Sequence, residues 1–142
     1  MIRLEETVIT PKPRAEVFAY VADFSTTAEW DPGIVSAERT SGDGGVGTTY
    51  RLEATFMGRT VPVTYEVLEY VEDERFVVEG SNPSFTGLDT ITFHDRDGAT
   101  EVVYVAEFEM KGLLRLVEPL LRGTFRKLGR KAVDGLDRVL NG

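Results

Sequence analysis

The C-terminal part of the chain carries the pattern that most restricts the fold. Over residues 113–140, apolar side chains recur at about 100° per residue, which predicts one long amphipathic helix. A helix with so broad an apolar face must bury it against another element. The expected face consists of Leu113, Val117, Leu120, Leu121, Phe125, Leu128, Ala132, Leu136 and Val139.

Three glycines interrupt this predicted helix, at Gly123, Gly129 and Gly135. In a helix interior each costs about 1 kcal/mol relative to alanine. We attribute these glycines to close approach of the helix to a sheet, or to flexibility that the helix requires.

The residues before the helix change their period. Residues 2–10 are rich in β-branched residues and predict a strand, and Pro13 suits the first turn of a helix that runs to Asp23. A second short helix is expected over residues 25–30, capped by Ser25 or Thr26 and ended by Pro32. Runs of β-branched and aromatic residues between turn sequences over 34–110 predict an antiparallel meander. The prediction is one α+β domain over 1–142.

Two hairpins can be assigned a register. A two-residue type II′ loop at Gly58 and Arg59 would place Met57 opposite Thr60 and Tyr50 opposite Val67.

The second hairpin turns at Asp97 and Gly98. A two-residue loop there pairs Phe93 with Val102 and Asp89 with Ala106. A four-residue loop is the alternative, and it shifts the pairs without changing which residues share a face.

Both registers place four polar side chains on the apolar inner face, namely Tyr50, Tyr65, Asp89 and Tyr104. If the helix packs flush on the sheet, each of these groups needs a buried partner. If a cavity separates helix and sheet, they become the few polar contacts that orient a ligand. The pattern alone leaves both arrangements open, and a bulge near Leu88 would turn Asp89 outward.

Composition excludes several classes of function. The chain has no cysteine, hence no disulfide, no thiolate nucleophile and no cysteine-ligated metal. It has a net charge of −8, which disfavours nucleic acid as the main partner. No apolar stretch reaches the ~20 residues that span a bilayer, so no stable membrane insertion is expected. The acidic N-terminal sequence does not resemble a signal peptide, and we expect a cytoplasmic location.

Two motif-like stretches have simpler interpretations as turns and loops. Gly42, Gly44 and Gly47 are spaced as in a dinucleotide loop, but a strand rather than a helix follows them. Asp95 and Asp97 form only a fragment of a calcium loop. We expect neither metal nor cofactor.

Two sets of ionisable side chains are interpreted as surface groups. His94, the single histidine, falls on the outer face opposite Glu101. The C-terminal helix carries an arginine stripe that could bind anionic lipid or an acidic partner, although such a row is usually the solvated side of a helix. The stripe consists of Arg115, Arg122, Arg126 and Arg130.

Three segments, PRAEVFAYVADFSTTAEWDPGI, SGDGGVGTTYRL and MKGLLRLVEPLLRGTFRKLG, resemble the polyketide cyclase/dehydrase branch of the START-like (SRPBCC) superfamily. The resemblance spans nearly the whole chain. It implies a helix-grip fold, in which a curved antiparallel sheet of about six to seven strands wraps a long C-terminal helix, with two short helices after the first strand. It also implies a cavity between sheet and helix.

The resemblance favours a module that binds a lipid, a polyketide or a polycyclic aromatic molecule. The alternative is an aromatase/cyclase-dehydrase-like enzyme, in which Asp89 and Tyr104 would be the candidates for proton transfer. A third possibility is an interaction domain whose core is filled by side chains. A cavity of ~300 Å³ or more is typical of a ligand site. Neither the residues nor the resemblance decides between a monomer and a homodimer.

Trp30 is expected to anchor the second short helix, with its ring bordering the cavity entrance. The residues predicted to line the cavity are Trp30, Tyr50, Leu52, Phe56, Tyr65, Phe93, Tyr104, Phe108, Leu121, Thr124, Phe125 and Leu128.

Overall fold

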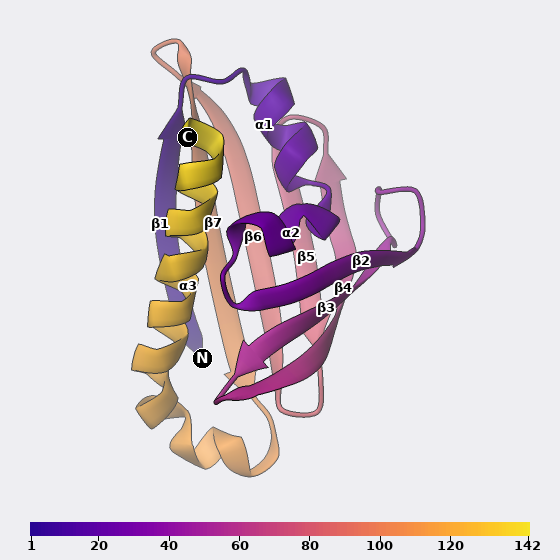
Figure 1. Cartoon of the computed structure of the whole chain (residues 1–142), viewed down its shortest axis with the longest axis vertical. Helices are drawn as coiled ribbons and strands as arrows, with labels where there is room; N and C mark the ends of the chain where they lie inside the picture. The colour runs from indigo at the N-terminus through magenta and orange to yellow at the C-terminus, as the bar shows by residue number, and fades with distance from the viewer.

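Seven antiparallel strands form one curved sheet in the order β1-β7-β6-β5-β4-β3-β2. The structure is a computed structural model that describes residues 1–142. All helices lie on one face of the sheet, and α3 runs along β1 and β7 (Figure 1). The elements are β1 (Ile2–Thr10), α1 (Arg14–Val21), the 3-10 helix η1 (Phe24–Thr26), α2 (Thr27–Trp30), β2 (Ile34–Ser41), β3 (Thr49–Phe56), β4 (Arg59–Val71), β5 (Arg75–Ser81), β6 (Phe85–Arg96), β7 (Ala99–Met110), the 3-10 helix η2 (Gly112–Val117) and α3 (Glu118–Asn141).

The order of elements agrees with the sequence-based prediction, and the sheet and long C-terminal helix are confirmed. The second short helix is divided into η1 and α2, and the side-chain cap lies at the start of η1 rather than of α2. Asp23 caps η1, because its Oδ1 accepts hydrogen bonds from the backbone N and the hydroxyl of Ser25, at 3.1 and 2.6 Å. Thr26 occupies the N-cap position of α2, but its side chain makes no capping hydrogen bond there.

The register predicted for the β3–β4 hairpin was wrong by two residues. Its loop consists of Met57 and Gly58, with φ of 53° and 79°, and Phe56 pairs with Arg59. Positive φ at both loop residues is the geometry of a type I′ turn, which favours glycine at the second position rather than the first. Tyr50 therefore pairs with Tyr65 instead of Val67, but the shift is even and every residue keeps its face.

The β6–β7 hairpin has the two-residue loop at Asp97 and Gly98, and Asp89 pairs with Ala106 as predicted. The register of β6 is continuous against both of its neighbours, so no bulge turns Asp89 outward. Asp89 is buried, with 6% of its surface exposed. His94 pairs with Glu101 and is exposed on the other face, as expected.

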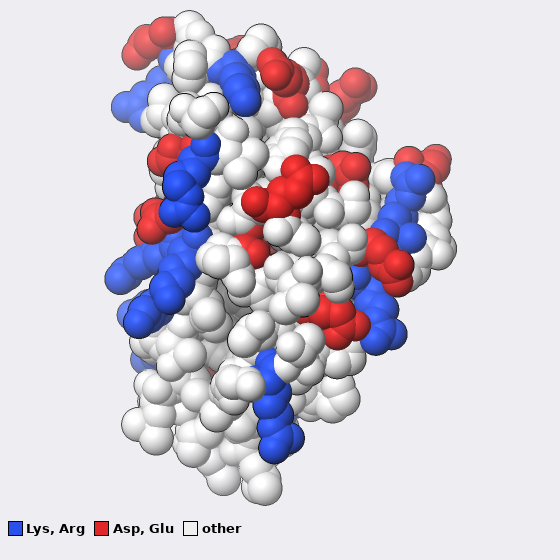
Figure 2. All heavy atoms as spheres, in the orientation of Figure 1, with Lys and Arg blue, Asp and Glu red and all other residues white.

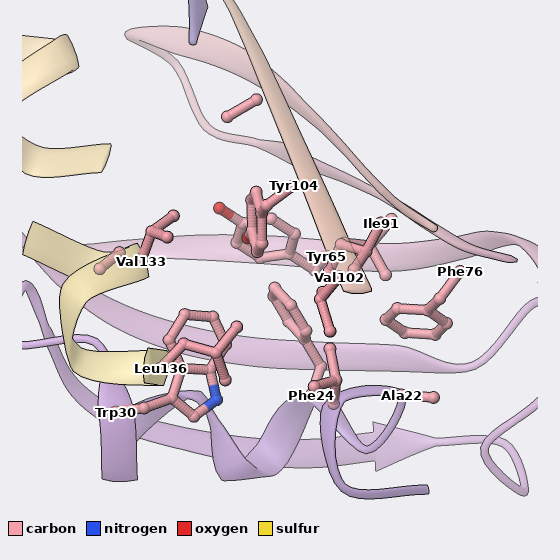
Figure 3. Packing of buried hydrophobic residues seen from close by; sticks show 14 of the residues in the cluster. Ala22, Phe24, Trp30, Tyr65, Phe76, Ile91, Val102, Tyr104, Val133 and Leu136 are labelled. Carbon is pink, nitrogen blue, oxygen red and sulfur yellow. The ribbon is translucent and has the colours of Figure 1, made fainter. Parts of the chain in front are cut away.

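Two of the three helix glycines allow close packing. A Cβ atom at Gly129 would collide with the side chain of Leu4 on β1, and one at Gly135 would collide with the backbone carbonyl of Trp30. Figure 3 shows Trp30 lying beside Leu136 of α3. Gly123 differs, since nothing lies within 4 Å of the position its Cβ would take. Close approach therefore explains two glycines but not the third.

The predicted apolar face of the C-terminal helix was wrong at three positions in its first part and at one near its end. Leu113 and Leu120 are 83% and 80% exposed, and Val117 and Val139 are also exposed. The segment forms two elements, because η2 ends where Pro119 begins the first turn of α3, and this break changes the direction of the side chains. Residues buried in α3 are Phe125, Ala132, Val133, Gly135, Leu136 and Leu140.

The exposed part of this segment leaves an apolar surface, here called the leucine patch, formed by Leu113, Leu116 and Leu120. The 3-10 helix η2 and the first turns of α3 extend beyond one end of the sheet (Figure 1). Figure 2 shows few charged side chains at this end of the molecule. The packing that fixes α3 thus comes from Phe125 and the residues that follow it.

Candidate functional site

A cavity of about 100 Å³ lies between α3 and the inner face of the sheet, and most of its lining is apolar. Exposed Thr55 and buried Tyr65 both line it, so the cavity runs from the surface inward. The surface is hollowed between α3 and the strands beside it (Figure 2). The volume is below the ~300 Å³ typical of a ligand site. The lining is Leu4, Asp31, Gly33, Ile34, Ala54, Thr55, Phe56, Val63, Tyr65, Phe85, Asp89, Tyr104, Ala106, Phe108, Phe125, Leu128, Gly129 and Ala132.

Asp89 and Tyr104 form a buried polar pair in the cavity wall. The Tyr104 hydroxyl donates a hydrogen bond of 2.7 Å to Oδ2 of Asp89. Burial raises the pKa of Asp89 to about 7; the hydrogen bond from Tyr104 opposes this rise and the negative charge of Asp31 adds to it. Burial, followed by the charge of Asp89, raises the pKa of Tyr104 well above its ordinary value. At neutral pH Tyr104 is thus a hydrogen-bond donor, and Asp89 exchanges between acid and carboxylate.

Tyr65 places a second hydroxyl in the same wall. Its ring lies over Gly80 of β5, where a Cβ atom would come within 2.5 Å of the ring carbon Cζ. Because glycine has no side chain, the tyrosine ring can lie directly against the backbone at this position. The Tyr65 hydroxyl makes no hydrogen bond within the protein, yet no buried polar side-chain atom is left without a partner. The hydroxyl is therefore open to the cavity.

Asp31 is the functional candidate that the sequence analysis missed. It follows α2 directly, lines the cavity, and accepts a hydrogen bond of 2.8 Å from the backbone N of Gly33. Burial raises its pKa to about 6, and the hydrogen bond from Gly33 opposes that rise. In the sequence Trp-Asp-Pro-Gly this residue reads as a turn former, and only the packing of α2 against the sheet and α3 brings it to the cavity.

Six of the twelve residues predicted to line the cavity do so: Phe56, Tyr65, Tyr104, Phe108, Phe125 and Leu128. The three phenylalanines of this group pack together at one end, where the ring of Phe125 lies 5.3 Å from that of Phe56 and 4.8 Å from that of Phe108.

The other six do not line it. Tyr50, Leu52 and Phe93 are fully buried in the core, and side chains of η1 and α1 cover Tyr50 and Phe93. Phe24 of η1 packs on Tyr50, and Phe18 of α1 packs on Phe93 at 5.1 Å between ring centroids.

Leu121 and Thr124 lie on the first half of α3, and Thr124 is exposed. Trp30 is a structural residue, as expected, but its ring does not border the cavity entrance. It is 3% exposed and packs edge-on to Tyr104, at 6.2 Å between ring centroids. The close approach of α3 at Gly135 covers it.

The arginine stripe is exposed along its whole length, and of its four residues only Arg130 is in an ion pair, with Glu6 at 3.7 Å. No group of three or more histidine, aspartate or glutamate side chains is arranged to hold a metal ion. No helix combines the length and the hydropathy that crossing a membrane requires.

A curved antiparallel sheet wrapped on a long C-terminal helix, with a cavity between them, defines the START-like helix-grip class of proteins. Residues 1–141 match the family model described as polyketide cyclase / dehydrase and lipid transport, and the chain belongs to this family. No curated protein sequence matches the chain.

Solved structures with the same fold are similar over nearly their full length. Protein TTHA0849 of Thermus thermophilus has a TM-score of 0.78 at 20% identity, with 96% of this chain and 94% of that chain covered. A START superfamily protein of Mycobacterium smegmatis has a TM-score of 0.78 at 14% identity, with 97% and 96% covered. The Zhui aromatase/cyclase of Streptomyces has a TM-score of 0.70 at 16% identity, with 96% and 94% covered.

Proposed function

We propose that this protein binds a hydrophobic small molecule, such as a lipid, a polyketide or a polycyclic aromatic compound, in the cavity between α3 and the sheet. The observation that carries the proposal is the composition of the cavity wall. Thirteen of its eighteen residues are hydrophobic, and its buried polar side chains converge from β4, β6 and β7. Apolar walls with a few placed polar groups are the usual design of a small-molecule site.

A cavity of about 100 Å³ is too small for such a ligand unless the wall moves. The first half of α3 is the part of the wall that can move at least cost. Leu113, Leu116 and Leu120 are 78–83% exposed, and Gly123 has open space around it. Outward movement of this segment would shift Phe125 and Leu128 away from the sheet, and the apolar part of the ligand would take over the contacts that Phe125 makes with Phe56 and Phe108. The ligand-bound cavity is therefore larger than the empty one.

The test is titration with the neutral fluorophore N-phenyl-1-naphthylamine, followed by the blue shift and gain of its emission. Ala132→Leu adds a side chain at the cavity wall and should weaken binding by about tenfold or more. The matched control Ala15→Leu, on the exposed surface of α1, should bind as the unchanged protein does. Equal binding by both variants would place the fluorophore elsewhere, and absence of binding by the unchanged protein would contradict the proposal.

The second candidate is a cyclase/dehydrase-like enzyme, favoured by the hydrogen-bonded pair of Asp89 and Tyr104. A carboxyl group with a pKa of about 7 can both accept and return a proton near neutral pH. Asp89 would remove a proton from a carbon between two carbonyl groups, and Tyr104 would donate a hydrogen bond to the oxygen that gains charge. The name of the Zhui protein describes an aromatase/cyclase, and that protein shares this fold.

This candidate is tested by incubating the protein with a synthetic poly-β-ketone thioester and measuring product masses. Cyclisation with loss of water should appear above the uncatalysed rate and fall by about 10²-fold or more in Asp89→Asn. A rate equal to the uncatalysed one would contradict the enzymatic function and leave only the binding function.

A further inference from the structure

The polar part of the cavity is acidic and contains no basic group. Asp31 and Asp89 both line it, and none of the other lining residues is lysine, arginine or histidine. Neither carboxyl group takes part in any ion pair of the molecule. Two carboxyl groups that share an apolar cavity without a counter-ion are an unusual arrangement, because each ionised group is costly to bury alone.

Three oxygen atoms in the cavity have no partner within the protein. Asp89 uses Oδ2 for Tyr104 and leaves Oδ1 free, and Asp31 uses Oδ1 for Gly33 and leaves Oδ2 free. The Tyr65 hydroxyl is the third, on a residue that is 8% exposed. Every fully buried polar side-chain atom of the molecule has a hydrogen-bond partner. These three atoms have none, so they face accessible space.

We propose that the ligand of this cavity is an amphiphilic amine, whose protonated amino group lies between Asp31 and Asp89 while its apolar part lies against the aromatic end of the cavity. This inference rests on the proposed binding function and specifies its ligand class. A primary ammonium group has three donors and no acceptor, which matches the three free oxygens. Its positive charge also compensates the carboxylates, whereas a ligand with a carboxylate or phosphate end would meet like charge in a medium of low dielectric.

The same arrangement makes binding depend on pH. The titratable groups around Asp89 are Asp31 from the α2–β2 connection, Tyr65 from β4 and Tyr104 from β7. From α3 the cavity receives only Phe125, Leu128, Gly129 and Ala132, none of which titrates. An ammonium group stabilises the carboxylate form of Asp89, so the protein should release a proton on binding near pH 6.5, and affinity should fall as the pH is lowered further.

The test compares three ligands with the same alkyl chain, n-octylamine, n-octanol and n-octanoate, by NMR titration of the full-length protein at pH 7.5. We expect octylamine to bind about tenfold or more tightly than octanoate, with octanol between them. Calorimetry of octylamine binding at pH 6.5 in two buffers of different ionisation enthalpy should detect proton release. A purely apolar site would release no proton.

The variant is the double substitution Asp31→Asn and Asp89→Asn, in which Tyr104 can still donate to the amide oxygen. It should remove the preference for the amine and leave octanol binding within about twofold. The control, Glu72→Gln with Asp134→Asn, makes the same change of net charge at two exposed positions and should keep the preference.

Octanol binding without preference for the amine, or an amine preference that survives the double substitution, would overturn this inference alone. Binding of none of the three ligands would overturn the proposed function together with it.

Discussion

Tyr104 donates its 2.7 Å hydrogen bond to Asp89 diagonally across two neighbouring strands, because the register pairs Tyr104 with Ile91 and Asp89 with Ala106. Diagonal neighbours on one face of an antiparallel pair lie within reach of a long aromatic side chain. Ala106, small and directly opposite Asp89, leaves room for the tyrosine hydroxyl to reach the carboxyl group. The strand register thus builds the polar centre of the cavity.

Replacing Tyr104 with phenylalanine should raise the pKa of Asp89 above about 7, because the hydrogen bond from Tyr104 is what lowers it. The loss of the donor from a buried carboxyl group should also reduce the free energy of unfolding by about 1–3 kcal/mol at pH 8. The pKa is measured by NMR titration of the carboxyl carbon. Tyr70→Phe, at an exposed tyrosine of β4, is the control and should leave this pKa unchanged.

The raised pKa of Asp89 predicts that the protein loses stability as the pH rises from about 4 to about 7. In this range the unfolded chain has released the proton of Asp89 while the folded protein still holds it, so its contribution falls by about 1.4 kcal/mol per pH unit and is constant above pH 7. Asp31 acts in the same direction up to about pH 6.

Urea unfolding of Asp89→Asn across this range should show a flatter dependence on pH and a gain in stability, relative to the unchanged protein, that grows toward pH 7. Asp134→Asn, at an exposed position of α3, is the control. Parallel curves for Asp89→Asn and the unchanged protein would show that Asp89 titrates normally.

Two glycine-to-alanine substitutions in the same helix should have opposite effects. Gly135→Ala places a methyl group against the Trp30 carbonyl and should lower the free energy of unfolding by roughly 1–3 kcal/mol, since backbone cannot easily give way. Gly123→Ala meets nothing within 4 Å and should raise it by about 0.5–1 kcal/mol through helix propensity. Both values come from chemical denaturation. Destabilisation by Gly123→Ala would mean that this part of α3 is packed.

The same leucine-to-alanine change at two positions of α3 measures where the helix is held. Leu136 is fully buried, and Leu136→Ala should cost about 2–5 kcal/mol of unfolding free energy. Leu120 is 80% exposed, and Leu120→Ala should change stability by no more than about 0.5 kcal/mol. A large cost at Leu120 would contradict the loose attachment of the first half of α3.

The sequence by itself determined which face of the sheet each strand residue takes and that a long helix ends the chain. Alternation of apolar and polar residues placed Asp89, Tyr65 and Tyr104 on the inner face and His94 on the outer face, because the side-chain period of a strand is two. The assignment of Tyr65 to the inner face was correct although the predicted register of the β3–β4 hairpin was wrong, because a shift of two residues leaves each side chain on the same face of the sheet. Helical periodicity likewise predicted the long C-terminal helix, and the proline and glycine positions ended most elements near the observed residues.

Only the tertiary structure decided which inner-face residues line the cavity and how large it is. The apolar period cannot tell a residue covered by α1 and η1, such as Phe93, from one beside a cavity, such as Tyr65, because both positions are equally apolar in sequence. Nor could it show that the first turns of the C-terminal helix extend past the sheet and leave Leu120 exposed. Asp31 and Asp89 line the same cavity because segments far apart in the chain pack together. Close packing at Gly129 and Gly135 sets how near α3 lies to the sheet, and this distance fixes the size of the cavity.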